Sequence, residues 1–181
     1  MSNIQKQTDV ILIGGGVMSA TDIECDATGI IPFFVYGTLM MADNGEGAWI
    51  ADVDRVERHL IVTGYSLFVT HGHFPYAMKV ENPNEFVFGE LIWPADADAA
   101  RKMTARLDRI EGHPHFYTRT LVEVTRNSRS TEAAWMYVFH TKHAWEPAAL
   151  KSIGSSWRTW KSQNPQEDKG ERPWQRPPAF A

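Results

Sequence analysis

An apolar run that ends in a glycine-containing turn is the feature that most restricts the fold of this chain. Residues 31–35 are apolar or β-prone, as a buried strand requires. Gly37 follows, and it lets the backbone turn through angles that a Cβ atom disfavours. The amides of Gly37, Thr38 and Leu39 would then converge, and clustered amides of this kind bind small anions. Taken alone, the segment is also typical of an ordinary strand-to-turn junction.

One helix is well specified in the middle of the chain. Pro94 opens it, and either Asp96 or Asp98 is suited to cap it. Gly112 and Pro114 end it. Its apolar residues recur at helical spacing, which predicts one buried face: Ala99, Ala100, Met103, Leu107 and Ile110.

Most other segments predict strands. The expected strands are 32–36, 60–69, 76–80, 86–92, 117–125 and 133–139. In the last of these, apolar residues occupy both alternating faces, so we expect the strand to be covered on both sides.

The connections are predicted from turn residues. Residues 41–51 predict a loop, and 82–84 a hairpin connection. A shorter helix is expected at 147–153, with Trp157 and Trp160 packing after it.

Composition indicates one globular domain. The chain has 181 residues, of which 43% are hydrophobic and 22% charged, and its net charge of −4 argues against nucleic-acid binding. No apolar run approaches the ~20 residues that span a bilayer. Cys25 is the only cysteine, which excludes an intrachain disulfide. With no secretion signal in the sequence, we expect a cytoplasmic protein without membrane partners.

The glycine-rich N-terminus resembles another family. Residues 8–21, with Gly14, Gly15 and Gly16 after an apolar run, resemble the N-terminus of malate:quinone oxidoreductases. A dinucleotide site also needs a helix, a second strand and an acidic residue about 20 positions on. Here Asp22 comes too early, and Pro32 interrupts any helix. We therefore interpret residues 1–30 as an extension or fused leader, 31–160 as the domain and 161–181 as a poorly ordered tail, and we expect no cofactor.

Glu111 is the strongest candidate for chemistry. It lies four residues after Leu107, beside the buried stripe, and at the helix C-terminus, where the macrodipole disfavours negative charge. Burial and the dipole should both raise its pKa, as a base acting near neutral pH requires. The alternative from the residues alone is a solvated helix-end glutamate.

Two separated motifs resemble the γ-glutamylcyclotransferase-like (AIG2-like) superfamily. These are the Tyr-Gly-Thr-Leu turn at 36–39 and the Leu-Asp-Arg-Ile-Glu-Gly segment at 107–112, which a tyrosine and an arginine follow at Tyr117 and Arg119. Thr118 stands between that pair here, and Thr38 replaces the commoner serine. The resemblance covers residues 33 to about 140. It implies an α+β fold, a small mixed, mostly antiparallel β-barrel with flanking helices.

The resemblance also implies an activity. Such enzymes cyclise a γ-glutamyl amine or peptide to 5-oxoproline and release the amine, an intramolecular acyl transfer that requires no metal. Glu111 matches the family's catalytic glutamate. The implied substrate-binding residues are Tyr36, Gly37, Thr38, Leu39, Tyr117 and Tyr137. The alternative is a non-catalytic module that binds a small metabolite on the same fold.

Other polar and aromatic residues favour structural roles. Glu90 lies in an apolar strand and needs a partner such as Arg119 if it is buried. The seven histidines include three closely spaced pairs, which we interpret as loop residues rather than a metal site. The tryptophans are expected in the core.

Overall fold

A closed barrel of five strands forms the centre of the molecule. The computed structural model describes residues 29–40, 52–69, 74–127, 130–139 and 150–165, and the backbone of 11–13 and 16–18. The strand order is β3-β7-β4-β8-β9. These strands are β3 (Phe33–Val35), β4 (Val53–Thr63), β7 (Phe86–Pro94), β8 (Tyr117–Asn127) and β9 (Ser130–Phe139). Neighbours are antiparallel except β3 and β9, whose parallel pairing closes the barrel. The expected α+β, mostly antiparallel barrel is confirmed.

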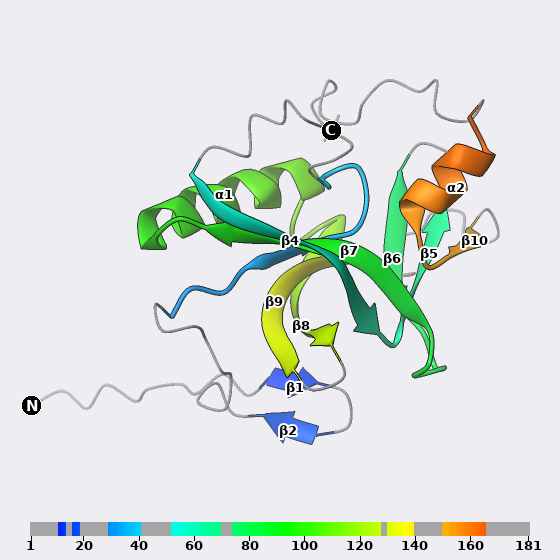
Figure 1. Ribbon diagram of the computed structural model, residues 1–181, viewed down its shortest axis with the longest axis horizontal. Coiled ribbons are helices and arrows are strands. Elements are labelled where there is room, and N and C mark those ends of the chain that lie inside the picture. The colour runs from blue at the N-terminus through cyan, green and yellow to red at the C-terminus, as the bar shows by residue number, and fades with distance from the viewer. Residues whose placement is uncertain are drawn as a thin grey trace, which may run out of the picture.

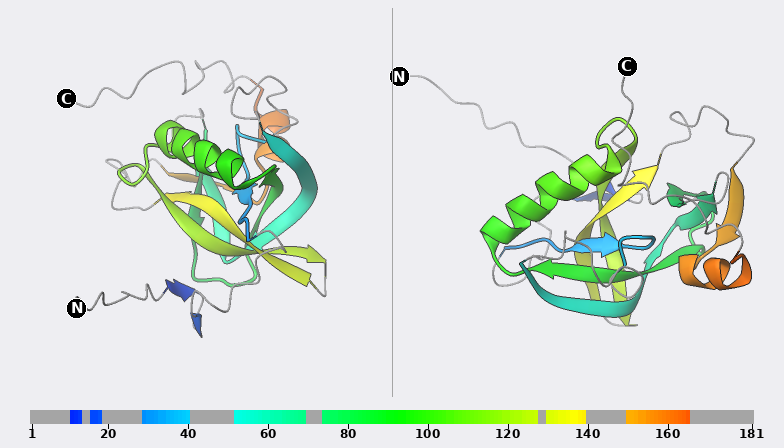
Figure 2. Two further views of the ribbon diagram at one scale, coloured as in Figure 1. Left: turned by 90° about the vertical axis from the view of Figure 1, so that its left-hand side faces the viewer. Right: turned by 90° about the horizontal axis from the view of Figure 1, so that it is seen from above.

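The remaining elements lie outside the barrel (Figure 1). Helix α1 (Ala97–Glu111) packs on one side of it, and a small sheet lies on another. That sheet has the order β10-β5-β6 and carries the C-terminal helix α2 (Trp157–Gln163). Its strands are β5 (Tyr65–Val69), β6 (Pro75–Lys79) and β10 (Lys151–Gly154). Two further views show α1 crossing the barrel strands (Figure 2). Within the described residues, no helix has the length and apolarity needed to cross a bilayer.

The caps of α1 agree with the sequence prediction. Asp96 is the N-cap, and its carboxylate accepts a 2.8 Å hydrogen bond from the Ala99 amide. Gly112 is the C-cap. Two members of the predicted stripe are not buried, because Ala100 is half-buried and Ile110 is 36% exposed. Ile110 lies in the last turn of α1 and lines a cavity.

Three predicted elements were wrong in part. The expected strand 60–69 is two strands, because Gly64 has φ +76 and bends the chain from the barrel into the small sheet. The turn at 82–84 joins strands of different sheets, β6 and β7, and makes no hairpin. The end of the helix expected at 147–153 is strand β10, which pairs with β5.

The aromatic core agrees with the prediction. Residues 134 and 136–139 are all buried, so β9 is covered on both faces. Trp157 and Trp160 stack with ring centroids 5.0 Å apart, and both are buried against the core. The helix that carries them continues to Gln163, inside the stretch that the sequence assigned to the tail.

The glycine-rich N-terminus does not show the start of a dinucleotide fold in its described backbone. Strand β1 (Ile11–Ile13) pairs in antiparallel fashion with β2 (Gly16–Met18), where the dinucleotide motif needs a helix. Cys25 and the loop expected at 41–51 lie outside the described residues, as do the tail residues after 165.

Candidate active site

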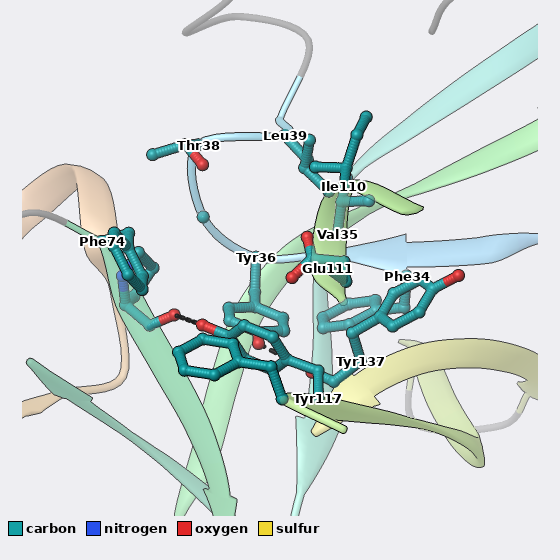
Figure 3. Close-up of a pocket in the computed structure, with 13 residues that line it drawn as sticks. Phe34, Val35, Tyr36, Thr38, Leu39, Phe74, Ile110, Glu111, Tyr117 and Tyr137 are labelled. Carbon is teal, nitrogen blue, oxygen red and sulfur yellow. Dashed lines mark hydrogen bonds between the residues drawn. The ribbon is translucent and has the colours of Figure 1, made fainter. Parts of the chain in front are cut away.

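One cavity brings together the turn after β3 and the C-terminal end of α1 (Figure 3). Among its walls are all seven residues proposed from the sequence: Tyr36, Gly37, Thr38, Leu39, Glu111, Tyr117 and Tyr137. The other described residues that line it are apolar: Phe34, Val35, Phe74, Pro75, Ile110 and Phe116.

The turn after β3 presents backbone amides. The Met40 amide donates a 3.0 Å hydrogen bond to the Gly37 carbonyl and closes the turn. No described residue accepts a hydrogen bond from the amides of Thr38 or Leu39. The turn can therefore offer these donors, with the Thr38 hydroxyl nearby, to an anion such as a carboxylate.

Close packing explains the glycine of this turn, and not the special backbone angles expected from the sequence, because Gly37 does not have a positive φ. A Cβ atom built on Gly37 would lie 2.5 Å from Cγ of Pro75, at the start of β6. The turn thus rests directly on the segment that carries Phe74. Any larger residue at this position would force either the turn or the Pro75 segment to shift.

Glu111 is the only charged residue among the described walls of the cavity. It is the last residue of α1, and its carboxylate points into the space beside Tyr36 (Figure 3). Burial among apolar groups raises its pKa from 4.5 to about 8, because the charged form loses hydration there. The sequence predicted a raised pKa from partial burial and the helix dipole together, and burial is the cause of the rise found here.

Two tyrosines of the cavity use their hydroxyl groups to hold the wall together. Tyr36 donates a 2.7 Å hydrogen bond to the carbonyl of Tyr137 and accepts one from the Ala77 amide. Tyr117 donates to the Pro75 carbonyl at 3.2 Å. Burial is the main reason why the pKa of both phenols is raised well above the usual value. For Tyr36, the nearby Glu111 is the next largest cause. Both therefore stay neutral and act as rigid walls.

A polar network behind Tyr137 was not predicted from the sequence. Its hydroxyl donates a 2.6 Å hydrogen bond to Asp108, whose carboxylate also accepts both contacts of Arg119, at 2.9 and 3.0 Å. Burial and this carboxylate raise the pKa of Tyr137. Asp108 lies one turn before Glu111 on α1, so the network links the barrel to the end of the helix. The position of Asp108 inside the 107–112 motif is the sequence signal that could have identified this network.

Glu90 has a different partner from the one expected. It is 1% exposed, and Arg158 of α2 donates to it at 2.7 Å, with Arg58 at 3.6 Å. Arg119 is a structural ion-pair partner as predicted, but of Asp108. Glu90 does not line the cavity. Its role is therefore to connect β7 with the C-terminal helix.

The histidine pairs form no metal cluster in the described part of the chain. Nδ1 of His113 accepts a 3.1 Å hydrogen bond from the Arg119 amide, which gives this side chain a structural role. The pairs at His71 and His73 and at His140 and His143 lie outside the described residues.

Three solved structures that match this chain have low sequence identity to it. YkqA from Bacillus subtilis matches with a TM-score of 0.54 and 17% identity; the match covers 76% of this chain and 43% of YkqA, so the chain spans less than half of that protein. An AIG2-like protein from Mus musculus matches at TM-score 0.47 and 23% identity, over 70% of this chain and 87% of the mouse protein. An uncharacterised protein from Pyrococcus horikoshii matches at TM-score 0.45 and 19% identity, over 75% of this chain and 97% of its own.

A comparison with curated proteins found no match. The family model described as gamma-glutamyl cyclotransferase, AIG2-like matches residues 33–159, which include the barrel, α1 and every residue of the cavity. This match spans well over half of the sequence, and the chain therefore belongs to the gamma-glutamyl cyclotransferase, AIG2-like family.

Proposed function

We propose that this chain is a cytoplasmic enzyme that cyclises a γ-glutamyl amide to 5-oxoproline and releases the amine. The observation that carries the proposal is that a carboxyl group of pKa about 8 shares one cavity with two turn amides that have no hydrogen-bond acceptor among the described residues. The amides of Thr38 and Leu39 suit the substrate's α-carboxylate. Glu111 suits the proton transfers that the cyclisation requires.

The α-ammonium nitrogen must lose two protons to become the N–H of the lactam, and the amide nitrogen must gain one to leave as a neutral amine. Glu111, as a carboxylate, takes a proton from the substrate's α-ammonium group, and the freed nitrogen attacks the γ-carbonyl carbon. The attacking nitrogen then loses its second proton to solvent, the bond between that carbon and the amide nitrogen breaks, and Glu111 returns the first proton to the departing nitrogen. The products are 5-oxoproline and a free amine, and Glu111 ends in its starting state.

The matched pKa values favour this role. An α-amino group has a reference pKa of ~8, so its proton moves to Glu111 at little cost in free energy. The attack is intramolecular, so the rate depends on holding the chain in its folded-back form. Such positioning supplies up to roughly 7–11 kcal/mol in favourable cases. The buried phenols of Tyr36 and Tyr117 keep the walls fixed for this purpose.

The decisive experiment compares Glu111→Gln with the wild type on a panel of γ-glutamyl amides, with 5-oxoproline release as the readout. Loss of general acid–base catalysis should lower kcat by ~10²–10⁴ while the fold stays intact. Glu90→Gln is the control, because it also neutralises a carboxyl group, but one that lies outside the cavity and pairs with Arg158. It should retain turnover once folding has been verified. Full activity of Glu111→Gln would remove Glu111 from the mechanism.

A second function follows from the protonated form of the same group. At neutral pH, Glu111 with its raised pKa is largely a carboxylic acid, which can donate a hydrogen bond to a bound anion. The domain would then bind a small acidic metabolite without converting it. Stabilisation of the fold by γ-glutamyl compounds with no 5-oxoproline formed would favour this function over the enzyme.

A further inference from the structure

We propose that Asp108 is a positioning residue for Glu111: its contacts with the barrel hold the last turn of α1 so that the carboxyl group of Glu111 lies inside the cavity. This inference rests on the proposed role of Glu111 and names the residue that sets its position. The evidence is the set of hydrogen bonds that meet at Asp108, on its backbone and on its side chain.

The last turn of a helix needs support from outside the helix. Its carbonyl groups have no partner within the helix, and helix ends fray for this reason. Glu111 is the final residue of α1. Among the residues that the structure describes, none donates a hydrogen bond to its carboxyl group or forms an ion pair with it. The place of this group in the cavity therefore depends on what holds the backbone of the last turn.

The carbonyl group of Asp108 closes the end of the helix. It accepts a hydrogen bond from the amide of Gly112, the C-cap residue, and another from the amide of His113 at 2.9 Å. Hydrogen bonds of this kind satisfy the free carbonyl groups at a helix end. Both of them cross the turn that contains Glu111, so the backbone on either side of Glu111 is fixed to Asp108.

The side chain of Asp108 ties this turn to two barrel strands. Nη1 of Arg119 on β8 lies 2.9 and 3.0 Å from its carboxylate oxygens, and the Tyr137 hydroxyl on β9 donates to it at 2.6 Å. The carboxylate and the guanidinium group are partly buried, so salt screens their attraction less than it screens that of an exposed pair. The amide of Arg119 also donates to Nδ1 of His113, at 3.1 Å. Strand β8 therefore holds the chain both before and after Glu111.

Tyr137 connects this junction to the cavity. Its ring is part of the cavity wall and lies near Glu111 (Figure 3), while its hydroxyl group donates to Asp108. Asp108 itself is not among the described residues that line the cavity. It therefore acts on the reaction through the position of Glu111, without contact with the substrate.

Release of the turn should bring water to Glu111. Its pKa is raised to about 8 because burial removes the hydration of the charged form, so access of water should lower this pKa towards 4.5. The three phenols nearby have raised pKa values and stay neutral. The titratable and charged groups that face this turn come from the elements packed against it and from α1: Tyr36, Tyr117, Arg119, Tyr137, Asp108 and His113.

Two substitutions that change the charge in opposite directions test this proposal. Asp108→Asn removes a negative charge and Arg119→Gln a positive one, so the change of charge alone would shift the pKa of Glu111 in opposite directions. We expect both variants to lower this pKa by about one unit or more, because both release the turn. NMR titration of the Glu111 side-chain carboxyl carbon, assigned with Glu111→Gln, provides the measurement. Asp98→Asn, which removes an exposed, ion-paired carboxylate from the first turn of α1, is the control and should leave the pKa unchanged.

The same variants should lower kcat and leave KM nearly unchanged. A displaced base slows the reaction, and we expect the maximum kcat to fall by about 10- to 100-fold. The turn that binds the α-carboxylate rests on Pro75 and not on α1, so substrate affinity should persist. The rise of kcat/KM with pH should begin at lower pH, in step with the pKa of Glu111. Arg119→Lys, which keeps the cation, should recover part of the kcat lost in Arg119→Gln.

The outcomes distinguish this proposal from the proposed function. An unchanged pKa of Glu111 in folded Asp108→Asn and Arg119→Gln, or shifts of opposite sign, would overturn the positioning role. A lowered pKa in both variants with unchanged kcat would support that role and count against Glu111 as the base of the cyclisation. Tyr137→Phe, which removes one hydrogen bond and no charge, provides the same measurement if either variant fails to fold. Its pKa for Glu111 should also fall, and an unchanged value would overturn the proposal.

Discussion

The hydroxyl of Tyr137 donates a 2.6 Å hydrogen bond to the carboxylate of Asp108 and so joins the last barrel strand to the helix that ends in Glu111. Arg119 on β8 holds the same carboxylate from its other side. Three elements thus meet one turn away from the cavity. The position of the Glu111 carboxylate depends on this junction as well as on the helix itself.

Removing the Tyr137 hydroxyl should destabilise the fold and disturb the site. A hydrogen bond to a charged group contributes about 1.5–3 kcal/mol, so we expect Tyr137→Phe to lower the free energy of unfolding by that amount. Urea unfolding at pH 7 measures this loss. Tyr65→Phe is the control, because no described group accepts a hydrogen bond from that hydroxyl. An unfolding free energy equal to that of the wild type would show that the junction contributes little.

The reaction should depend on pH through Glu111. Only the carboxylate form accepts a proton, so kcat/KM should rise about tenfold per pH unit below the pKa of about 8. The substrate's α-ammonium loses its own proton near pH ~8, which places the maximum close to that value. Rates of 5-oxoproline release between pH 5.5 and 9.5 provide the measurement. A profile that is flat from pH 5.5 to 7 would contradict a base with a raised pKa.

Glu111→Gln should stabilise the protein while it abolishes turnover. The folded-state pKa of Glu111, about 8, lies above its ordinary value of 4.5, so the folded state binds this proton more tightly than the unfolded state does. The glutamate's contribution to stability is therefore fully present below pH 4.5 and is lost as pH rises to about 8, by about 1.4 kcal/mol per pH unit. Glutamine does not titrate, so the free energy of unfolding of the variant should exceed that of the wild type by an amount that grows from pH 4.5 to about 8.

Urea unfolding at pH 5 and pH 8 tests that window. The difference between Glu111→Gln and the wild type should be small at pH 5 and should reach a few kcal/mol at pH 8. Glu123→Gln, which removes an exposed carboxylate on β8, is the control. If the difference in unfolding free energy between Glu111→Gln and the wild type instead decreased as pH rises, folding would lower the pKa of Glu111 and not raise it.

Gly37→Ala should weaken substrate binding because of a steric conflict. The new Cβ atom would lie 2.5 Å from Cγ of Pro75, and one of the two segments must shift. We expect KM to increase by ~10-fold, equivalent to about 1.4 kcal/mol, with a smaller effect on kcat. Steady-state kinetics on one γ-glutamyl amide measure both values.

A second substitution tests the cause of that loss. Pro75→Ala removes Cγ and Cδ, and the remaining Cβ would be 4.0 Å from the new methyl group. The double variant Gly37→Ala/Pro75→Ala should therefore recover much of the lost affinity, relative to Pro75→Ala alone. No recovery would mean that the glycine is needed for a reason other than this contact.

Local signals were sufficient for most elements and for the motifs whose residues line the cavity. The caps of α1 depend on Asp96 and Gly112, whose effects act within a few residues, so the sequence located the helix. The turn at 36–39 and Glu111 were identified by their motifs, and they line one cavity. Short-range patterns failed at Gly64, where one predicted strand is two, and at β10, whose strand conformation depends on pairing with β5.

The sequence by itself determined a barrel-forming set of strands, one capped helix and the residues available for acid–base chemistry. Only the tertiary structure decided that Asp108 rather than Glu90 pairs with Arg119, and that Arg158 neutralises Glu90. It also decided which apolar residues are left exposed around Glu111. The physical reason is that capping and periodicity act between neighbours in the chain. Ion pairing, desolvation and the shape of a cavity depend on groups that only folding brings together.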